Sequence, residues 1–385
     1  MRRTVALVAL GLVAASVPVF LMPGADAEQQ QGPAQPAGEA HTIEIGTVVP
    51  QDVDLSGLTT GAATLDHPGA QYIKVHFERL VMAPNDYLTV SAPDGSQEQR
   101  FTSTSGSRWA TSITGDTAVL ELHSAGDAAS AALGATGISV DRIARGLTET
   151  EMARQLAADP LPESVCGTDE ERDAVCYRSS DPDVYDSTAP VARLLINGTT
   201  LCTAWRVGAN NRMLTNNHCL TDTATVRNTE VWFNFQCQTC AGKDVGDVVK
   251  VNGDRVLSTD QTYDYTLFTV DDFDAVADFG YLRLARHQAT AGEKLYIPQH
   301  PSGQPTQIAM TSDTDSGACR VDNPVYDGYV TGSDVSYYCD TQFGSSGSPV
   351  LSRDTHEVIA LHHFGGCPNS GVRADLLYQL IGNQL

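Results

Sequence analysis

The sequence predicts a mostly β chain, with a small β-sandwich followed by a larger strand-rich part. Its 385 residues include 33 Gly and 18 Pro and carry few long charged runs, a composition typical of short strands joined by turns. Short alternating strand-like pieces fill residues 43–145, whereas all nine cysteines lie from Cys166 onward. A chain of this length holds two or three domains as a first expectation.

The composition excludes two classes of protein. Forty-seven Asp and Glu against 24 Lys and Arg give a net charge of −23. So acidic a surface leaves no room for the large basic patch that phosphate-driven nucleic-acid binding needs. An apolar fraction of 41% is adequate for packed cores, so disorder along most of the chain is excluded as well.

Residues 1–27 have the pattern of a signal peptide. Two arginines precede a nearly uninterrupted apolar run, which ends at small residues with cleavage expected after Ala27. A single membrane anchor is the alternative, but polar residues follow the run at once. No later segment is apolar for long enough to span a bilayer. We therefore expect a secreted protein without a membrane anchor, with residues 28–42 as a linker.

Residues 43–145 predict a small antiparallel β-sandwich. Strand-like pieces lie at 71–77, 86–90 and 118–123, with turns at 93–95 and 114–116. The series is similar to CUB-like sandwiches. A fold by itself implies no function, so this domain is either a pro-region or accessory module or a ligand-binding module.

Residues 146–165 form a second linker. Thr148 opens a capping-box pattern, which predicts a two-turn helix closed by Pro160 and Pro162. The remaining residues 166–385 consist of strands and turns, with a single further helix expected at 374–380.

The cysteines predict disulfides, because an exported chain meets an oxidising compartment. Cys237 and Cys240 are the alternative half of a zinc site, but no second pair of ligands accompanies them. We therefore expect no metal at this pair, although a structural Ca²⁺ elsewhere stays open for so acidic a surface. Nine is an odd number, so one thiol is left over, and we expect it to be Cys237 or Cys240.

Three short segments carry groups suited to nucleophilic catalysis. His218 follows a strand-like run, Asp264 opens an apolar strand, and Ser346 lies between glycines at 344 and 347. A serine hydroxyl needs an imidazole to take its proton, and the imidazole needs a carboxylate to fix its tautomer. The N–H groups of Gly344 and Ser346 can converge on a developing oxyanion, where one such donor is worth roughly 3 kcal/mol.

The order of these residues along the chain separates the folds that use this triad. His, Asp, Ser differs from the order in subtilisins and from the order in α/β-hydrolases. Ser348 stands where the α/β-hydrolase elbow requires glycine, which weakens an ester hydrolase as the alternative.

Residues 166–385 resemble a chymotrypsin-fold serine endopeptidase, closer to the bacterial lysyl and glutamyl (V8-like) endopeptidases than to animal trypsins. The resemblance is carried by LCTAWRVGANNRMLTNNHC, DYTLF, GSSGSPV and VIALHHFGGC. It implies two six-stranded antiparallel barrels, protein or peptide substrates and no cofactor, and we expect a monomer. It also implies that His218 is the base, Asp264 its orienter and Ser346 the nucleophile, with the amides of Gly344 and Ser346 as the oxyanion hole.

The same resemblance implies a set of disulfides. The expected pairs are Cys202 with Cys219, Cys166 with Cys367, Cys319 with Cys339, and Cys176 with either Cys237 or Cys240.

The residue before the nucleophile departs from the trypsin pattern. Trypsins carry an aspartate there, which receives the amino terminus freed on activation, but this chain has Ser345. A serine has no charge to pair with an ammonium group. We therefore expect this zymogen to be activated by cleavage within 146–165, which removes the N-terminal region.

The specificity for the residue before the scissile bond (P1) stays ambiguous. Asp340 lies six residues before Ser346, where trypsins hold the acid of the S1 pocket, and this favours Lys or Arg. Thr341 and His362 lie where glutamyl endopeptidases hold the substrate carboxylate, although lysyl endopeptidases also have a histidine near His362. Asp340 is alternatively a structural residue that binds backbone amides.

The sequence as a whole predicts a secreted serine endopeptidase precursor that works through an acyl-enzyme on Ser346, with basic P1 preference expected and glutamyl preference as the alternative. A different class of function stays open beside it. The sandwich could be a surface-binding module, with the protease domain used for processing.

Overall fold

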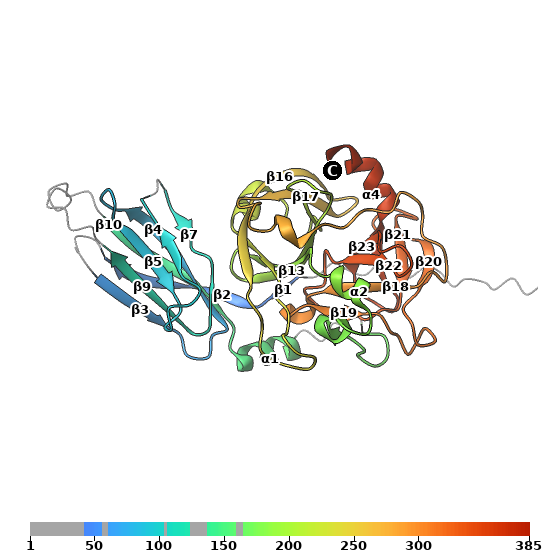
Figure 1. The fold of residues 1–385 in the computed structure, drawn as a ribbon, viewed down its shortest axis with the longest axis horizontal. Coiled ribbons are helices and arrows are strands. Elements are labelled where there is room, and N and C mark those ends of the chain that lie inside the picture. The colour runs from blue at the N-terminus through green and yellow to red at the C-terminus, as the bar shows by residue number, and fades with distance from the viewer. Residues whose placement is uncertain (1–41, 56–60, 104–105, 124–136, 159–164) are drawn as a thin grey trace, which may run out of the picture. The chain divides into compact units, whose positions relative to one another are not determined.

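The computed structural model describes residues 42–385, except 56–60, 104–105, 124–136 and 159–164 (Figure 1). The expected signal peptide and nearly all of the first linker lie outside the described residues. The described residues belong to one compact unit that spans 36–385. Within them, no helix is both long and apolar enough to cross a membrane.

The region after the first linker consists of two antiparallel sheets. One has the order β2-β10-β4-β7, with β8 also paired to β4, and the other has the order β3-β9-β5-β6. Their strands are β2 (Gly46–Asp54), β3 (Gly61–Asp66), β4 (Tyr72–Val81), β5 (Tyr87–Ser91), β6 (Gln99–Phe101), β7 (Arg108–Trp109), β8 (Ile113–Thr114), β9 (Thr117–His123) and β10 (Gly137–Gly146). Side chains from both sheets share one buried cluster, for example Val75, Leu88 and Leu120. These two packed sheets have the sandwich architecture that the alternating pattern predicts.

A closed antiparallel barrel of six strands follows, drawn in green to yellow in Figure 1. Its strands run in the order β13-β12-β15-β16-β17-β14, and pairing of β13 with β14 closes the barrel. They are β12 (Val191–Ile196), β13 (Thr200–Arg206), β14 (Met213–Thr215), β15 (Thr229–Phe233), β16 (Val249–Asp260) and β17 (Tyr265–Val270). Alternate residues of β12, namely Ala192, Leu194 and Ile196, fill its core. A two-residue strand, β1 (Ile43–Glu44), pairs with β13 along the edge opposite to the one that β12 occupies.

The last part of the chain forms an eight-stranded sheet instead of a second six-stranded barrel. Its order is β11-β19-β18-β22-β23-β24-β21-β20. The strands are β11 (Arg172–Asp173), β18 (Leu295–Gln299), β19 (Gln307–Ala309), β20 (Val321–Tyr326), β21 (Asp334–Tyr337), β22 (Pro349–Ser352), β23 (Val358–Phe364) and β24 (Asn369–Arg373). β20 is half-exposed and irregular in register against β21. At its start, Val321 exchanges backbone hydrogen bonds with Glu293 and Gly292, at 2.9 and 2.8 Å, beside the bridge between Lys294 and Arg320. Of the two barrels expected, one is closed.

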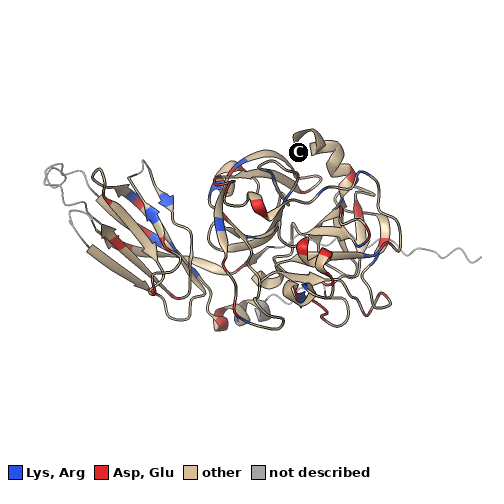
Figure 2. Cartoon of the chain, viewed as in Figure 1, with Lys and Arg blue, Asp and Glu red and all other residues tan. Residues whose placement is uncertain are grey.

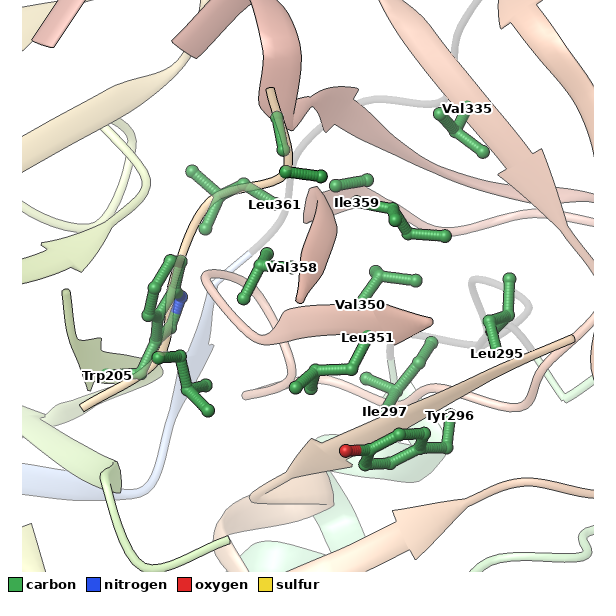
Figure 3. Close-up of a cluster of buried hydrophobic side chains, with 14 of the residues drawn as sticks. Trp205, Leu295, Tyr296, Ile297, Val335, Val350, Leu351, Val358, Ile359 and Leu361 are labelled. Atoms are coloured by element: carbon green, nitrogen blue, oxygen red, sulfur yellow. The ribbon is translucent and has the colours of Figure 1, made fainter. Parts of the chain in front are cut away.

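The largest buried cluster fills the eight-stranded sheet and continues into the barrel. Figure 3 shows Tyr296 and Ile297 of β18 beside Val350 and Leu351 of β22, with Trp205 of β13 in the same cluster. Side chains from distant segments therefore share one core, which fixes the nucleophile turn relative to the barrel.

Four α-helices lie among the described residues, and the sequence predicts two of them. Thr148 and Glu151 form the capping box of α1 (Glu149–Ala158), because each side chain accepts the backbone N–H of the other. The C-terminal helix is α4 (Ala374–Ile381). The helices α2 (Pro182–Asp186) and α3 (Thr223–Arg227) are too short to show helical periodicity. Short 3₁₀ turns complete the set: η1 (Ala174–Tyr177), η2 (Ala277–Phe279), η3 (Pro301–Gly303) and η4 (Gly382–Gln384).

The cysteines form four disulfides. The pairs are Cys166–Cys367, Cys176–Cys240, Cys202–Cys219 and Cys319–Cys339. They are the pairs that the resemblance implies, and Cys176 takes Cys240 of its two alternatives. Cys237 is the free cysteine and is buried. Because Cys240 is oxidised, this segment cannot offer two thiolates to a metal ion.

A buried charged cluster joins the sandwich to the barrel. Glu230 of β15 is fully buried, and its carboxylate lies 2.8 Å from Nζ of Lys74 in β4. Ser112 donates to it from its backbone N–H at 2.9 Å and from its hydroxyl at 2.8 Å, and the Trp232 indole donates at 2.8 Å. These contacts explain why a strand as apolar as β4 buries a lysine. Elsewhere the acidic residues are scattered over the described chain (Figure 2).

Candidate active site

Two neighbouring strands of the barrel bring His218 and Asp264 together. β14 ends three residues before His218, β17 begins just after Asp264, and these strands pair at Thr215 and Thr266. Asp264 Oδ2 lies 2.8 Å from His218 Nδ1, and Oδ1 accepts the His218 backbone N–H at 2.9 Å. Asn216 also donates to the Asp264 carbonyl at 3.0 Å. The carboxylate therefore fixes both the ring and the backbone of His218.

Asp264 remains ionised although it is only 1% exposed. Burial raises the pKa of its carboxyl, but the hydrogen bonds and charges of His218 and His363 outweigh burial and hold the pKa well below its ordinary value. A buried carboxylate that accepts a hydrogen bond from a ring nitrogen is the group that keeps a catalytic imidazole in one tautomer.

A second histidine, His363, contacts the same carboxylate. Its Nδ1 lies 3.2 Å from Asp264 Oδ2, and its Nε2 lies 2.7 Å from Oδ2 of Asp334. Ser370 donates to the same Asp334 oxygen at 2.8 Å. Since each ring nitrogen faces a carboxylate oxygen, the geometry fits a doubly protonated imidazolium. Burial lowers the pKa of His363, but the two carboxylates outweigh it and raise the pKa to about 9.

The sequence analysis singles out His362 but not His363. Consecutive residues of a strand point to opposite faces, so β23 directs these two histidines to different surroundings. That alternation is a signal that could identify His363 from sequence. Asp334 gives no such signal, because it lies on another strand, 29 residues before His363.

The turn around Ser346 packs against β13. Thr203 donates its backbone N–H to the Ser346 carbonyl at 2.8 Å and its hydroxyl to the Gly344 carbonyl at 2.9 Å. Gly344 and Gly347 have φ of 92° and 88°, a region that favours glycine. A Cβ at Gly347 would lie 2.1 Å from the Thr203 carbonyl oxygen, so no other residue fits there. Both glycines are thus required to turn the backbone N–H groups beside the nucleophile.

Ser346 and His218 are connected through β13. Thr203 holds Ser346, and its neighbour Cys202 is bonded to Cys219, which follows His218. His218 Nε2 is buried and makes no hydrogen bond to another residue that the structure describes. This nitrogen is therefore free to accept a proton from a serine. A group with metal-ligand spacing also lies here, formed by Cys202, His218 and Cys219. Because the two sulfurs are bonded to each other in a disulfide, they cannot bind a metal ion as thiolates.

The three residues expected in S1 have different surroundings. Asp340 is 1% exposed, and its two oxygens accept the backbone N–H groups of Cys166 at 3.0 Å and Glu170 at 2.9 Å. Burial raises the pKa of this carboxyl to about 6. Both of its oxygens are thus engaged by the segment that begins at Cys166.

Thr341 and His362 lie on either side of the nucleophile turn in sequence. The Thr341 hydroxyl is buried and has no hydrogen-bond partner among the described residues. His362 Nδ1 lies 2.7 Å from the Tyr337 hydroxyl, and burial lowers the pKa of the ring to about 3. The backbone of His362 pairs with the turn itself, since its carbonyl accepts the Gly347 N–H at 2.9 Å. His362 is therefore a neutral ring held beside the serine.

A comparison with known protein families agrees with this fold. Residues 202–361 match the family described as "Trypsin-like peptidase domain". "Secreted RxLR effector protein 73" of Plasmopara viticola is 31% identical over 331 residues, which cover 82% of this chain and 79% of that protein. A Glu endopeptidase structure is 20% identical over 57% of this chain and 98% of its own, with a TM-score of 0.41. The inactive form of Rv3671c protease is 15% identical over 58% and 98%, with a TM-score of 0.40.

The closed antiparallel barrel and the glycine-flanked serine turn fit the trypsin-like peptidase domain that residues 202–361 match. The chain belongs to the same family as the Plasmopara protein.

Proposed function

We propose that this chain is a serine endopeptidase that hydrolyses peptide bonds through an acyl-enzyme on Ser346. The observation that carries the proposal is the geometry of His218. Asp264 holds it by two hydrogen bonds, at 2.9 and 2.8 Å, while its Nε2 is buried without a partner among the described residues. A histidine positioned in this way can act as a general base, because its second ring nitrogen is available to accept a proton.

Acylation starts when the Ser346 hydroxyl gives its proton to His218 Nε2 and its oxygen attacks the substrate carbonyl. The carbonyl π electrons move to its oxygen, which the N–H groups of Gly344 and Ser346 stabilise. Asp264 stabilises the imidazolium that results. The ring then gives its proton to the departing amine as the carbon–nitrogen bond breaks.

Deacylation repeats these steps with water as the nucleophile. His218 takes a proton from the water, hydroxide adds to the acyl carbon, and Ser346 leaves with the proton returned by the ring. Protein or peptide chains are the substrates of this reaction. The residues present supply every proton transfer.

For the P1 residue, we propose a preference for Glu over the expected Lys or Arg. The basic preference depends on Asp340, but both of its oxygens bind backbone N–H groups of the 166–170 segment. This supports the structural role for Asp340. Thr341 instead keeps an unpaired buried hydroxyl, and His362 is a neutral ring beside the nucleophile turn. Both groups can donate hydrogen bonds to a carboxylate.

Purified protein tested on matched Glu, Lys, Arg and Leu peptide amides decides the specificity, with Ser346→Ala as the blank. We expect cleavage after Glu, and about a tenfold or larger loss of kcat/KM in Thr341→Val, since one unpaired donor is then removed. Asp340→Asn keeps a carbonyl acceptor and serves as the control, with P1 preference unchanged. Cleavage after Lys or Arg that Asp340→Asn abolishes would reverse the assignment. No cleavage of any amide by the form processed within 146–165 contradicts the endopeptidase itself.

Secretion and maturation belong to the same proposal. Four disulfides fit an extracellular protein, and the Plasmopara relative is named as secreted. Ser345, whose hydroxyl accepts the Gln342 N–H at 3.2 Å, carries no charge for a new amino terminus. Cleavage within 146–165 therefore remains our proposal for activation. The buried contacts of Glu230 with Lys74 and Ser112 support an accessory role for the sandwich.

A further inference from the structure

The short strand β1 lies on the edge of β13, close to the nucleophile turn. Ile43 is opposite Leu201 and Glu44 is opposite Thr200, in antiparallel register. Ile45 donates its N–H to the Thr199 carbonyl at 2.7 Å. Because hydrogen-bonded pairs recur at every second residue of an antiparallel ladder, Ile43 and Leu201 form a pair of the same kind.

This edge leads directly to Ser346. Thr203, which holds the Ser346 carbonyl, is two residues beyond Leu201 on the same strand. Two residues of a strand span roughly 7 Å. Leu201 itself borders the oxyanion-hole glycine, since a Cβ on Gly344 would lie 3.6 Å from that of Leu201. A chain paired at this edge in the direction of β1 has its preceding residues on the side of the nucleophile.

The two sides of the nucleophile turn are bordered by different strands. On one side the turn pairs with β23, where the Gly347 N–H meets the His362 carbonyl and the His362 N–H meets the Ser348 carbonyl at 3.0 Å. The proposed S1 residue His362 assigns the acyl half of the substrate to that side. The leaving half then lies on the side of β13. An exposed strand edge is a standard binding surface for an extended peptide.

We propose that β1 occupies the edge of β13 at residues 199–201, where the leaving-group half of an extended substrate would pair, and that β1 thereby restrains cleavage of extended substrates. The proposal rests on the proposed endopeptidase function. Ile43 and Ile45 are 5% and 6% exposed and pack with Leu201 and Trp232, so β1 is held by apolar contacts as well as by its backbone. A pocket lined by Ile45, Trp232 and Gly303, among others, flanks the same edge and can take a side chain.

Two substrates with the same acyl half separate this restraint from the chemistry. One ends in a small chromogenic amine, and the other continues for four residues beyond the scissile bond. Ile43→Pro removes the N–H that pairs with Leu201. We expect kcat/KM for the extended peptide to rise about tenfold in this variant, the scale of one or two displaced hydrogen bonds, and that for the chromogenic amide to stay unchanged.

Matched controls keep the test decisive. Glu44→Ala alters an exposed side chain of the same strand and should change neither rate. Ile43→Gly weakens the apolar contact without the proline ring and covers the case in which Ile43→Pro does not fold. Adding a synthetic peptide of residues 42–47 to a folded variant should restore the restraint on the extended substrate.

Each result points to one conclusion. A rise confined to the extended peptide supports the proposal. Equal rates for the variants and the natural chain on the extended peptide, or parallel losses on both substrates, would show that β1 is only structural. If the chain cleaved within 146–165, which is the proposed active form, cleaves neither substrate above the Ser346→Ala blank, the endopeptidase function fails instead.

Discussion

One oxygen of Asp264 is shared by two histidines, and this arrangement defines the site at the scale of single residues. His218 and His363 both direct Nδ1 to Oδ2, at 2.8 and 3.2 Å. Asp334 holds the other nitrogen of His363 at 2.7 Å. A chain of hydrogen-bonding contacts therefore holds the ring of His218, the proposed base, in place. It runs from Asp334 through His363 and Asp264 to His218. We infer that His363 is a positioning residue, since it acts through Asp264.

The charge of His363 has a consequence for stability. Its pKa of about 9 in the folded chain is above the 6.5 of a free histidine. The imidazolium therefore stabilises the fold fully below about pH 6.5, and this stabilisation is lost as the pH rises through about 9. We expect the contribution of His363 to the free energy of unfolding to fall by about 2 kcal/mol between pH 6.5 and 8. Burial lowers the pKa of Lys250 to about 8 and that of His300 and His362 to about 3, so these groups act in the opposite direction over the same range. The contribution of His363 is therefore measured as the difference between the natural chain and a His363 variant.

Urea unfolding at pH 6.5, 7 and 8 measures this loss. The stability difference between the natural chain and His363→Gln should shrink by about 2 kcal/mol from pH 6.5 to 8, whereas the difference between the natural chain and His287→Gln, at an exposed position, should stay constant. A difference from His363→Gln that stays constant over this range would contradict the charged assignment.

At the scale of elements, the side-chain contact between β4 and β15 depends on one carboxylate. Glu230 is buried, and burial alone would raise the pKa of its carboxyl. The cations of Lys74 and Lys250 and the hydrogen bonds from Ser112 outweigh burial and hold this pKa below its ordinary value. Lys74 is only 1% exposed. Removing one partner of a buried ion pair leaves an uncompensated charge and costs about 3–5 kcal/mol.

Glu230→Gln should therefore lower the free energy of unfolding by an amount near that range, measured as a shift of the urea midpoint. Asp52→Asn removes an exposed acid of β2 and should change stability by less than about 0.5 kcal/mol. If Glu230→Gln is as stable as Asp52→Asn, the buried charged cluster around Glu230 does not stabilise the contact between β4 and β15.

The elements differ in how far their sequence predicts them. The capping box of α1 and the alternation of the sandwich strands are local patterns, so they can be recognised without the fold. β1 has two residues and a partner more than 150 positions away, and no local pattern marks it. The chain of contacts through His363 likewise depends on Asp334, which reaches it only because β21 and β23 both pair with β24.

At the scale of the whole molecule, the disulfides and the barrel connect the three proposed catalytic groups. Cys202–Cys219 ties β13, against which the nucleophile turn packs, to the proposed base. The motifs that carry the resemblance contain the three proposed catalytic residues and both cysteines of the Cys202–Cys219 pair, so the sequence points to them. The sequence does not determine substrate specificity, because the role of Asp340 depends on which backbone groups its oxygens meet in the fold.

Covalent labelling measures most directly whether Ser346 is an activated nucleophile. A phosphonofluoridate forms a phosphorus–oxygen bond only with an activated serine hydroxyl and releases fluoride. Treated at pH 7.5 and digested, the secreted protein should carry one label, on the peptide that contains Ser346. His218→Ala should slow labelling by at least about 10³-fold, since the general base is lost. Labelling at another serine, or equal labelling in His218→Ala, would contradict the account.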